Sequence, residues 1–381
     1  MDQSLKSNIA RAALLAIVAA AAPVAALAQS SVDIYGRMDL GMLSQDITVG
    51  HGINASTFSL AGAQNTRTDS RLGFRGTEDL GGGLRAGFVY EIGINPDRDA
   101  GTNAQTRLAN LSLSGGFGTV VVGTFMNAFD TAREFSPGRS SIPGGRATEW
   151  QAEALTERFD SRSQNAIAYV SPDFNGFRFS AGFVNNSDET RTLAGAAETG
   201  TGFDYTGMIL GVAFTQGPLR AQFAYGNLDI GFHTGIPGTN AGNLAAPVNT
   251  DVTNWALGLS YDFGPAVVSF VYEDSSRDMV MNAPGRTAFA GVDRNAWEIG
   301  ARFPMGAFAP YVTFGQGERT NITTAGGRTT YDINTWQIGT TYNLSARTWV
   351  YAAIGEAQRE TSAGLNVREE TGYSIGIVHT F

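Results

Sequence analysis

The residue types that usually carry catalysis or metal binding are few in this sequence and lie far apart. It holds three histidines, His51, His233 and His379, and no cysteine. A zinc site or a histidine-activated nucleophile needs such side chains close together. The Asp and Glu residues concentrate in polar stretches expected to be exposed, whereas a general acid needs a shielded position. The sequence therefore predicts no enzyme, no metal site and no cofactor.

Several arginines follow a more regular pattern, because they alternate with apolar residues. Arg37 falls on the same side of a predicted strand as Asp33, Tyr35 and Asp39, whereas Val32, Ile34, Met38 and Leu40 take the other side. Arg71 and Arg75 alternate in the same way with Leu72 and Phe74. Period-two alternation is typical of a strand with one polar and one apolar face. The chemistry that these residues predict is electrostatic, a charged wall built on strands.

The same alternation recurs along the chain and supplies the elements that must position the arginines. In the clearest case Trp255, Leu257, Leu259, Tyr261 and Phe263 share one face, with small or polar residues such as Ser260 between them. Residues 177–183, 297–303 and 373–381 repeat the pattern. We therefore predict an all-β fold whose strands each have a polar and an apolar side.

The first 28 residues have the pattern of a secretory signal peptide. Lys6 and Arg11 precede an uncharged alanine-rich stretch, and Ala26-Leu27-Ala28 supplies a cleavage site of small residues. The stretch is shorter than the roughly 20 apolar residues that cross a bilayer. We expect residues 1–28 to be removed, leaving 29–381 as the mature domain. A net charge of −9 argues against nucleic acid as a partner.

Short connections alternate with long polar ones in the mature chain. The turn-like segments are residues 79–83, 115–118, 171–176, 215–218, 262–265, 304–307 and 343–346. The longer stretches include residues 45–68, 126–161, 187–203, 230–251, 275–293 and 317–331. Seven turns alternating with eight loops make fifteen connections and hence about sixteen strands. An even number of strands with short turns at one end is the layout of an outer-membrane barrel.

A closed barrel also satisfies the requirement that every backbone polar group within a bilayer be paired. The predicted fold is thus a transmembrane antiparallel β-barrel. Aromatic residues near the strand ends, namely Trp255, Trp297, Trp336, Tyr342 and Trp349, are candidates for its interfacial girdles. The alternative is a soluble β-protein in which these aromatic residues pack in an ordinary core.

Four segments resemble the general diffusion porins of Gram-negative bacterial outer membranes. Residues 31–37 resemble the opening strand of that family, and residues 70–81 its second strand and first turn. Residues 107–123 and 165–172 are similar to the strands that enter and leave the third loop, and the terminal Phe381 resembles the signal read by the outer-membrane assembly machinery. The resemblance covers essentially the whole mature chain.

This resemblance implies a constriction loop and a set of pore residues. The third loop, residues 126–161, would fold into the barrel and narrow it. Its acidic residues Asp130 and Glu134 would face a basic wall across the constriction, the arrangement by which pores select ions. That wall would comprise Arg37, Arg71, Arg75, Arg107 and Arg162. The same loop also holds Arg133, Arg139, Arg146 and Arg158, which leaves the sign of the ion preference open.

The predicted function is passive diffusion of small hydrophilic solutes and ions across the outer membrane. The resemblance implies a homotrimer in outer-membrane lipid, inserted by the assembly machinery. The alternative within transport is a channel selective for sugars or anions. The alternatives from other classes are a barrel enzyme, for which the three histidines supply no evident site, and a secreted adhesion protein, which would lack a membrane belt.

Overall fold

The computed structural model describes residues 31–50, 53–61, 70–94, 106–138, 145, 162–186, 202–233, 248–279, 289–323, 326–361 and 366–381. The predicted signal peptide, residues 1–28, lies outside the described residues. Within these ranges we find no helix long and apolar enough to cross a membrane.

Strands dominate the described chain and one short helix interrupts them. The strands in the first half are β1 (Ser31–Val49), β2 (Ile53–Ala61), β3 (Arg71–Gly81), β4 (Leu84–Gly93), β5 (Thr106–Gly115), β6 (Gly118–Phe125), β7 (Ser163–Val170) and β8 (Phe177–Asn186). Helix α2 (Ala128–Arg133) lies between β6 and β7. The strands in the second half are β9 (Gly202–Gln216), β10 (Leu219–His233), β11 (Val248–Asp262), β12 (Val267–Met279), β13 (Phe289–Arg302), β14 (Phe308–Thr323), β15 (Arg328–Asn343), β16 (Thr348–Thr361) and β17 (Asn366–Thr380).

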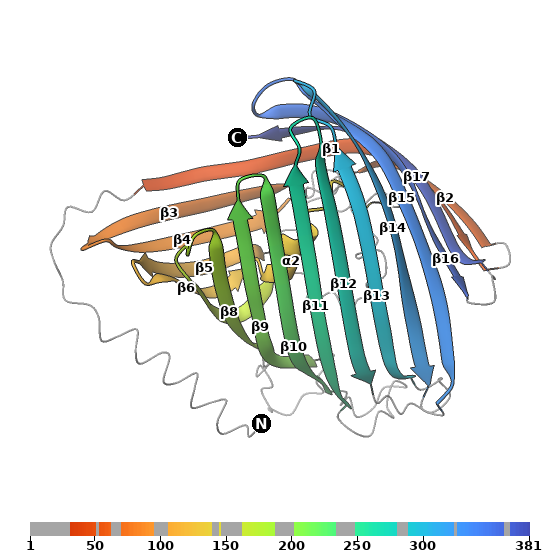
Figure 1. The fold of residues 1–381 in the computed structure, drawn as a ribbon, viewed down its shortest axis with the longest axis horizontal. Helices are drawn as coiled ribbons and strands as arrows, with labels where there is room; N and C mark the ends of the chain where they lie inside the picture. The colour runs from red at the N-terminus through yellow and green to blue at the C-terminus, as the bar shows by residue number, and fades with distance from the viewer. Residues whose placement is uncertain are drawn as a thin grey trace, which may run out of the picture.

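These strands close into an antiparallel barrel (Figure 1). One edge of β1 pairs with β17 over residues 37–49. Its other edge pairs with β3 over residues 31–37 and with β2 over residues 41–49, so β2 and β3 lie in line and share one place in the wall. The seventeen strands therefore fill sixteen places, as predicted. Closure leaves no sheet edge bare to lipid, which is the condition for crossing a bilayer with strands.

All seven predicted turns are present, and they lie at one end of the barrel, here called the turn end. The opposite, loop end differs from the prediction, because several strands continue into stretches that their polarity marked as loops. β1 and β2 occupy most of residues 45–68, and β14 extends through Thr323. Polar residues remain strand-forming there because the antiparallel ladder keeps pairing the backbone beyond the apolar band.

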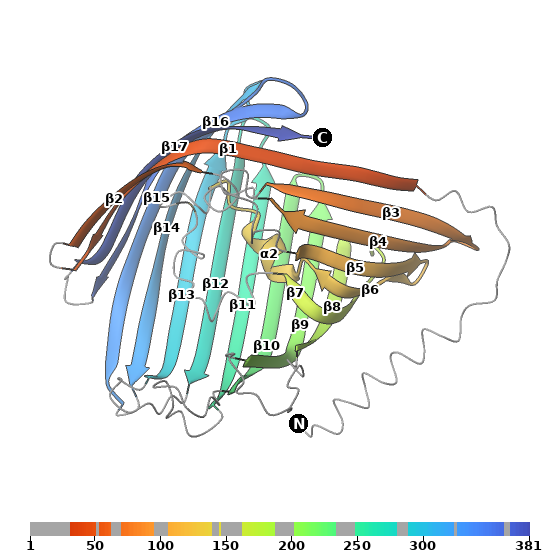
Figure 2. The ribbon, with the colours of Figure 1, turned by 180° about the vertical axis from the view of Figure 1, so that it is seen from behind.

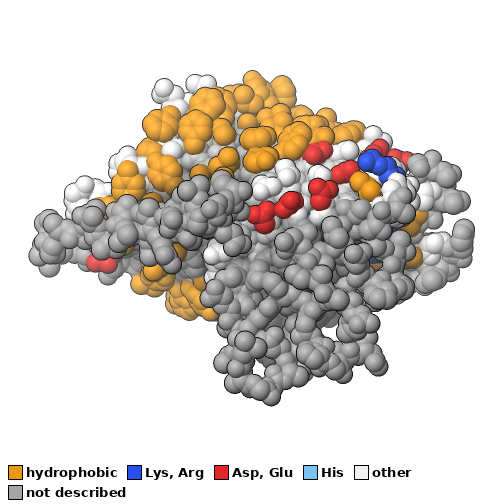
Figure 3. Space-filling model, turned by 90° about the horizontal axis from the view of Figure 1, so that it is seen from below, with side chains coloured by type: hydrophobic (Ala, Val, Ile, Leu, Met, Phe, Trp, Pro, Cys, Tyr) orange, Lys and Arg blue, Asp and Glu red, His pale blue; other side chains and the backbone are white. Residues whose placement is uncertain are grey.

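The two faces of each strand differ as the alternation predicted. The outward positions expose large apolar side chains, such as Ile299, Ile338 and Ile375 at 47%, 53% and 57%. Figure 3 shows hydrophobic side chains gathered in a broad band on the outer surface, with carboxylates along its border. The inward positions of β11 include Asn254, Ala256 and Gly258, which are buried. The outer band thus faces lipid and the inner row faces the lumen.

One aromatic residue does not take the position that we predicted. Trp255, Trp297, Trp336 and Tyr342 lie on outward positions of their strands. Trp349 instead lies opposite the fully buried Val378, and the Arg37 guanidinium is 5.8 Å from the centre of its ring. It therefore faces the lumen and cannot belong to an interfacial girdle. Trp349 was predicted for the girdle because it lies near a strand end. The alternation of β16, however, directs its side chain into the lumen.

Candidate functional site

Helix α2 turns the chain inward immediately after β6. Asn127 caps the helix, because its side chain accepts hydrogen bonds from the backbone N–H groups of Phe129 at 3.0 Å and Asp130 at 3.2 Å. The apolar side of the helix, Phe129 and Ala132, is fully buried in a cluster that includes Ala224 of β10 and Ala256 of β11. Both ribbon views place α2 inside the ring of strands (Figures 1 and 2).

Glycines on the inner wall make room for this segment. A Cβ added at Gly258 of β11 would lie 2.4 Å from the Ala132 carbonyl oxygen. One added at Gly300 of β13 would lie 2.5 Å from Cδ of Pro137. Such distances are too short for any side chain, so the backbone approaches the wall at positions that only glycine permits. Residues 126–138 therefore rest on the inner wall. Apart from Gly145, residues 139–161 of the predicted loop lie outside the described residues, and their inward course stays a prediction.

A buried carboxylate fastens the helix to the wall. Glu273 of β12 accepts hydrogen bonds from Arg133, from Nε at 2.9 Å and Nη2 at 2.5 Å. It also accepts one from Arg294 Nη2 at 2.7 Å and one from Asn254 Nδ2 at 3.1 Å. A charge without water is tolerated only when it is paired and hydrogen-bonded in this way. Farther along, the Ser136 hydroxyl donates to Glu298 of β13.

Sequence reasoning missed Glu273 and gave Arg133 no partner. The available signal was parity, since Glu273 falls in the same row of β12 as the buried Val271 and Ser275. The partner itself was out of reach, because Arg133 and Glu273 are 140 positions apart and meet only when the barrel closes. Arg133 therefore attaches the loop to β12 through Glu273 and does not face solvent.

A second cluster lies on the wall formed by β1, β3, β4 and β5. The Glu91 carboxylate accepts hydrogen bonds from Arg107 Nε at 2.8 Å and from the Tyr35 hydroxyl at 3.0 Å, and it lies 3.7 Å from Arg71 Nη1. Arg37 pairs directly with Arg71 across the β1–β3 ladder. The structure thus brings Arg71 and Arg107 together on one carboxylate, with Arg37 beside Arg71 in the ladder.

A β-bulge directs Arg107 inward. The β4–β5 register shifts between Glu91 and Ile92, which pair with Leu108 and Thr106, so Arg107 is the extra residue. A bulge bends the strand and changes the direction of a side chain. Without it, Arg107 would share the outward parity of Ala109 and Leu111. The predicted basic residue is therefore placed by a local irregularity that alternation does not reveal.

The remaining predicted residues are more scattered. Arg75 lies toward the turn end, 3.5 Å from Asp33 and with its guanidinium 5.1 Å from the centre of the Tyr35 ring. Arg162 lies just before β7 and is half-buried. Asp130 lies in the first turn of α2, and Glu134 follows its last residue and interacts electrostatically with Arg37. Arg139, Arg146 and Arg158 lie outside the described residues.

The barrel, its outer apolar band and its charged lumen define the class of protein, a membrane channel of the outer-membrane type. Residues 13–362 match the family described as Gram-negative porin, and the chain belongs to that family. It is an outer-membrane porin, a channel for small hydrophilic solutes and not an enzyme.

Individual relatives align over nearly their whole length. The chain is 30% identical to outer membrane porin protein 32 of Delftia acidovorans, over 97% of this chain and 99% of the relative. The anion-selective porin from Comamonas acidovorans has a similar structure, with a TM-score of 0.66 and 25% identity over 93% of this chain and 100% of that one. The trimer form of OmpT from Vibrio cholerae shares the fold, with a TM-score of 0.60 and 15% identity over 92% and 99%.

Proposed function

We propose that this porin favours anions and that residues 126–138 narrow its lumen opposite a basic wall. The observation that carries the proposal is the cluster of Arg37, Arg71 and Arg107, in which Arg71 and Arg107 share the carboxylate of Glu91 and Arg37 lies opposite Arg71. Arginine keeps its charge at any working pH, so a cluster of guanidinium groups cannot relax by losing protons. Arg71 and Arg107 share one carboxylate, so this pair contributes a net positive charge to the lumen.

The charge balance of the described wall supports the same preference. Inward positions hold more arginines than carboxylates. The arginines are Arg37, Arg71, Arg75, Arg85, Arg107, Arg178, Arg220, Arg277, Arg294, Arg302, Arg319, Arg359 and Arg368, and the carboxylates are Asp33, Asp39, Asp79, Glu91, Asp262, Glu273, Glu298 and Glu370. Arg294 lies directly opposite Arg319, and Arg359 directly opposite Arg368. Like charges directly opposite destabilise a ladder, and Glu273 and Glu370 offset part of this repulsion by pairing with Arg294 and Arg368.

Two of the buried carboxylates are held by neighbouring side chains. Glu273 is surrounded by two arginines, and Asp39 accepts a hydrogen bond from the Tyr351 hydroxyl at 3.1 Å. A solved structure with the same fold is named as an anion-selective porin. These observations favour anions over the alternative of a sugar-selective path, for which the described wall offers no particular feature.

The zero-current potential of the purified protein in a planar bilayer under a KCl gradient tests this proposal. We expect the sign of an anion-preferring pore for the wild type. The double variant Arg71→Gln/Arg107→Gln should move the potential toward cation preference. Arg347→Gln, which removes a guanidinium at an exposed turn, is the matched control and should leave the potential unchanged. A cation-preferring wild type would contradict the proposal.

The assembly proposed for the chain is a homotrimer of cleaved, mature subunits. The trimer form of an outer membrane protein with the same fold supports it, and the pattern of residues 1–28 supports cleavage after Ala28. Mass spectrometry of the protein purified from outer membranes tests both points. The native mass should equal three subunits, and each subunit should begin at Gln29.

A further inference from the structure

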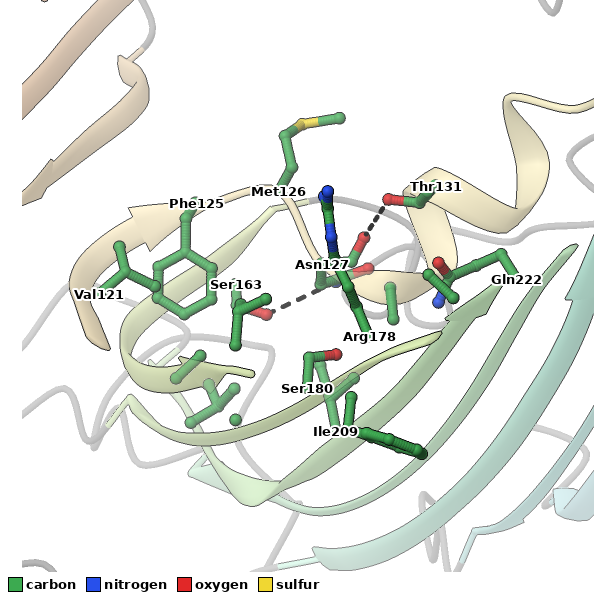
Figure 4. Close-up of a pocket in the computed structure, with 17 residues that line it drawn as sticks. Val121, Phe125, Met126, Asn127, Thr131, Ser163, Arg178, Ser180, Ile209 and Gln222 are labelled. Atoms are coloured by element: carbon green, nitrogen blue, oxygen red, sulfur yellow. Dashed lines mark hydrogen bonds between the residues drawn. The ribbon is translucent and has the colours of Figure 1, made fainter. Parts of the chain in front are cut away.

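A cavity of about 340 Å³ lies between the start of the constriction loop and the inner wall of β6–β10 (Figure 4). Much of its lining is apolar and includes Val121, Phe125, Val170, Val184 and Ile209. The lumen of a water-filled barrel is ordinarily polar. Apolar inward positions in such a lumen are therefore exceptions that need a reason.

Seating α2 does not account for the whole of this apolar surface. The helix buries Phe129 and Ala132 completely against β10 and β11, whereas Phe125 and Ala128 are only partly buried beside that cluster. The cavity lies along β6–β10 and leaves Val121 and Val170 only half-buried. Apolar surface left facing water is unfavourable, and a molecule that covered it would be stabilised there.

One charged side chain accompanies the apolar wall. Among the described residues that line the cavity, Arg178 of β8 alone is charged, and Figure 4 shows its side chain beside Asn127 and Ser180. Its Nε is 3.6 Å from an Asp173 carboxylate oxygen, and the two side chains are 60% and 49% exposed. An exposed ion pair of this kind contributes little to stability, so Arg178 can exchange it for another carboxylate.

We infer that this cavity binds amphipathic monocarboxylates, molecules with one carboxylate and a compact aromatic or aliphatic body, during their passage through the pore. Arg178 binds the carboxylate, for which the planar guanidinium offers two parallel donors. The body covers the apolar wall formed by Val121, Val170 and Ile209. The volume lies at the small end of ligand sites, which span roughly 300–1,000 Å³, and this favours a single ring or a short chain.

The subsite deepens the proposed function, because it rests on a lumen that admits anions. Chloride and acetate meet Arg178 but gain nothing from the apolar wall. A neutral apolar molecule covers the wall but forms no ion pair with Arg178, which stays paired with Asp173. Only a solute with both features uses both parts of the cavity.

The experiment is current block of the full-length porin in planar bilayers bathed in KCl. The probes are 3-phenylpropionate, acetate and 3-phenylpropan-1-ol, which carry both features, the charge alone and the body alone. We expect saturable block by 3-phenylpropionate at concentrations at which the other two leave the current unchanged. Equal block by either control probe would overturn the subsite.

Variants assign the block to this cavity. Arg178→Gln should raise the half-blocking concentration of 3-phenylpropionate roughly tenfold or more, the loss expected for one charge-assisted interaction. Arg302→Gln is the matched control, since Arg302 is an exposed inward arginine at the turn end of β13 and does not line the cavity. Val121→Thr/Val170→Thr keeps the β-branched shape and should also weaken the block. Equal effects of Arg178→Gln and Arg302→Gln, or wild-type block in the valine variant, would overturn the proposal.

The potential in KCl alone separates this inference from the proposed function. An anion-preferring pore without selective block keeps the proposed preference and overturns the subsite. A cation-preferring pore that still shows block dependent on Arg178 overturns the preference and keeps the subsite.

Discussion

At the scale of the residue, the lumen is organised by contacts between positions that are distant in sequence. Glu273 and Glu91 each draw at least two arginines together, and each lies on an inward position of a strand. Glycines such as Gly258 and Gly300 are as informative as the charges, because they mark where the loop backbone approaches the wall. Alternation placed Gly258 and Gly300 on the small or polar side of their strands, yet it gave no partner for either, because the partners come from a distant part of the chain.

The seat of α2 gives a prediction for one such glycine. Gly258→Ala adds a Cβ that would lie 2.4 Å from the Ala132 carbonyl oxygen, so the helix must move away from β11. Overpacking of this kind costs about 1–3 kcal/mol. We expect faster trypsin cleavage after Arg133 in the folded variant and a more variable single-channel conductance. Gly116→Ala is the control, because nothing lies within 4 Å of a Cβ there. Identical cleavage in the two variants would show that the helix is not held as described.

At the scale of the element, most of the strand layout was predictable from sequence, because it depends on local signals. Gly, Pro, Asn and Asp mark the seven turns, and period-two alternation gives the two faces. The loop-end boundaries were not predictable in this way, because backbone pairing continues where the side chains have become polar. The bulge at Arg107 and the inward direction of Trp349 likewise depend on the register between strands.

The face assignment of β11 leads to a prediction about insertion. Leu257 lies outward, paired with Phe223 and Tyr272, whereas Ser260 lies inward, paired with Arg220 and Ser269. Leu257→Arg should weaken folding into bilayers by about 2–4 kcal/mol if the position is near the midplane. Ser260→Arg faces the lumen opposite Arg220, so it should lose much less stability than Leu257→Arg and should alter the conductance. Urea titration of folding into vesicles compares the two variants, and equal loss of stability would mean that the strand faces are misassigned.

At the scale of the whole molecule, the barrel closes where its two ends meet. Gly36 and Phe381 exchange backbone hydrogen bonds of 3.1 and 3.2 Å. The Phe381 ring covers Gly36 so closely that an added Cβ would lie 2.3 Å from its Cζ. Phe381 therefore has a structural contact with β1 in addition to the assembly role that we propose from its resemblance to the family's assembly signal.

Deleting Phe381 should lower the amount of folded barrel in the outer membrane and leave the conductance of assembled pores unchanged. The deletion removes both the ring over Gly36 and one backbone donor at the closing seam. Folded and unfolded forms in outer-membrane fractions can be quantified by their heat-dependent mobility on gels. Phe303→Ala, which truncates another exposed phenylalanine near the turn end, is the control. Wild-type amounts of the deletion variant would argue against the assembly signal.

Ion selection is also a property of the whole lumen, because it depends on charges that face each other across it. Glu134 interacts electrostatically with Arg37, and we propose that it and Asp130, in the first turn of α2, together oppose the arginine cluster of β1, β3 and β5. Asp130→Asn/Glu134→Gln should therefore shift the zero-current potential further toward anions, opposite to the shift expected for Arg71→Gln/Arg107→Gln. Both shifts should be large in dilute salt and fade in concentrated salt, since the Debye length is about 30 Å at 0.01 M and about 3 Å at 1 M. The measurement is the potential at a fixed concentration ratio with the mean concentration raised stepwise. A shift that persists at 1 M would indicate a change in pore shape, and no shift at 0.01 M would place the selecting charges elsewhere in the lumen.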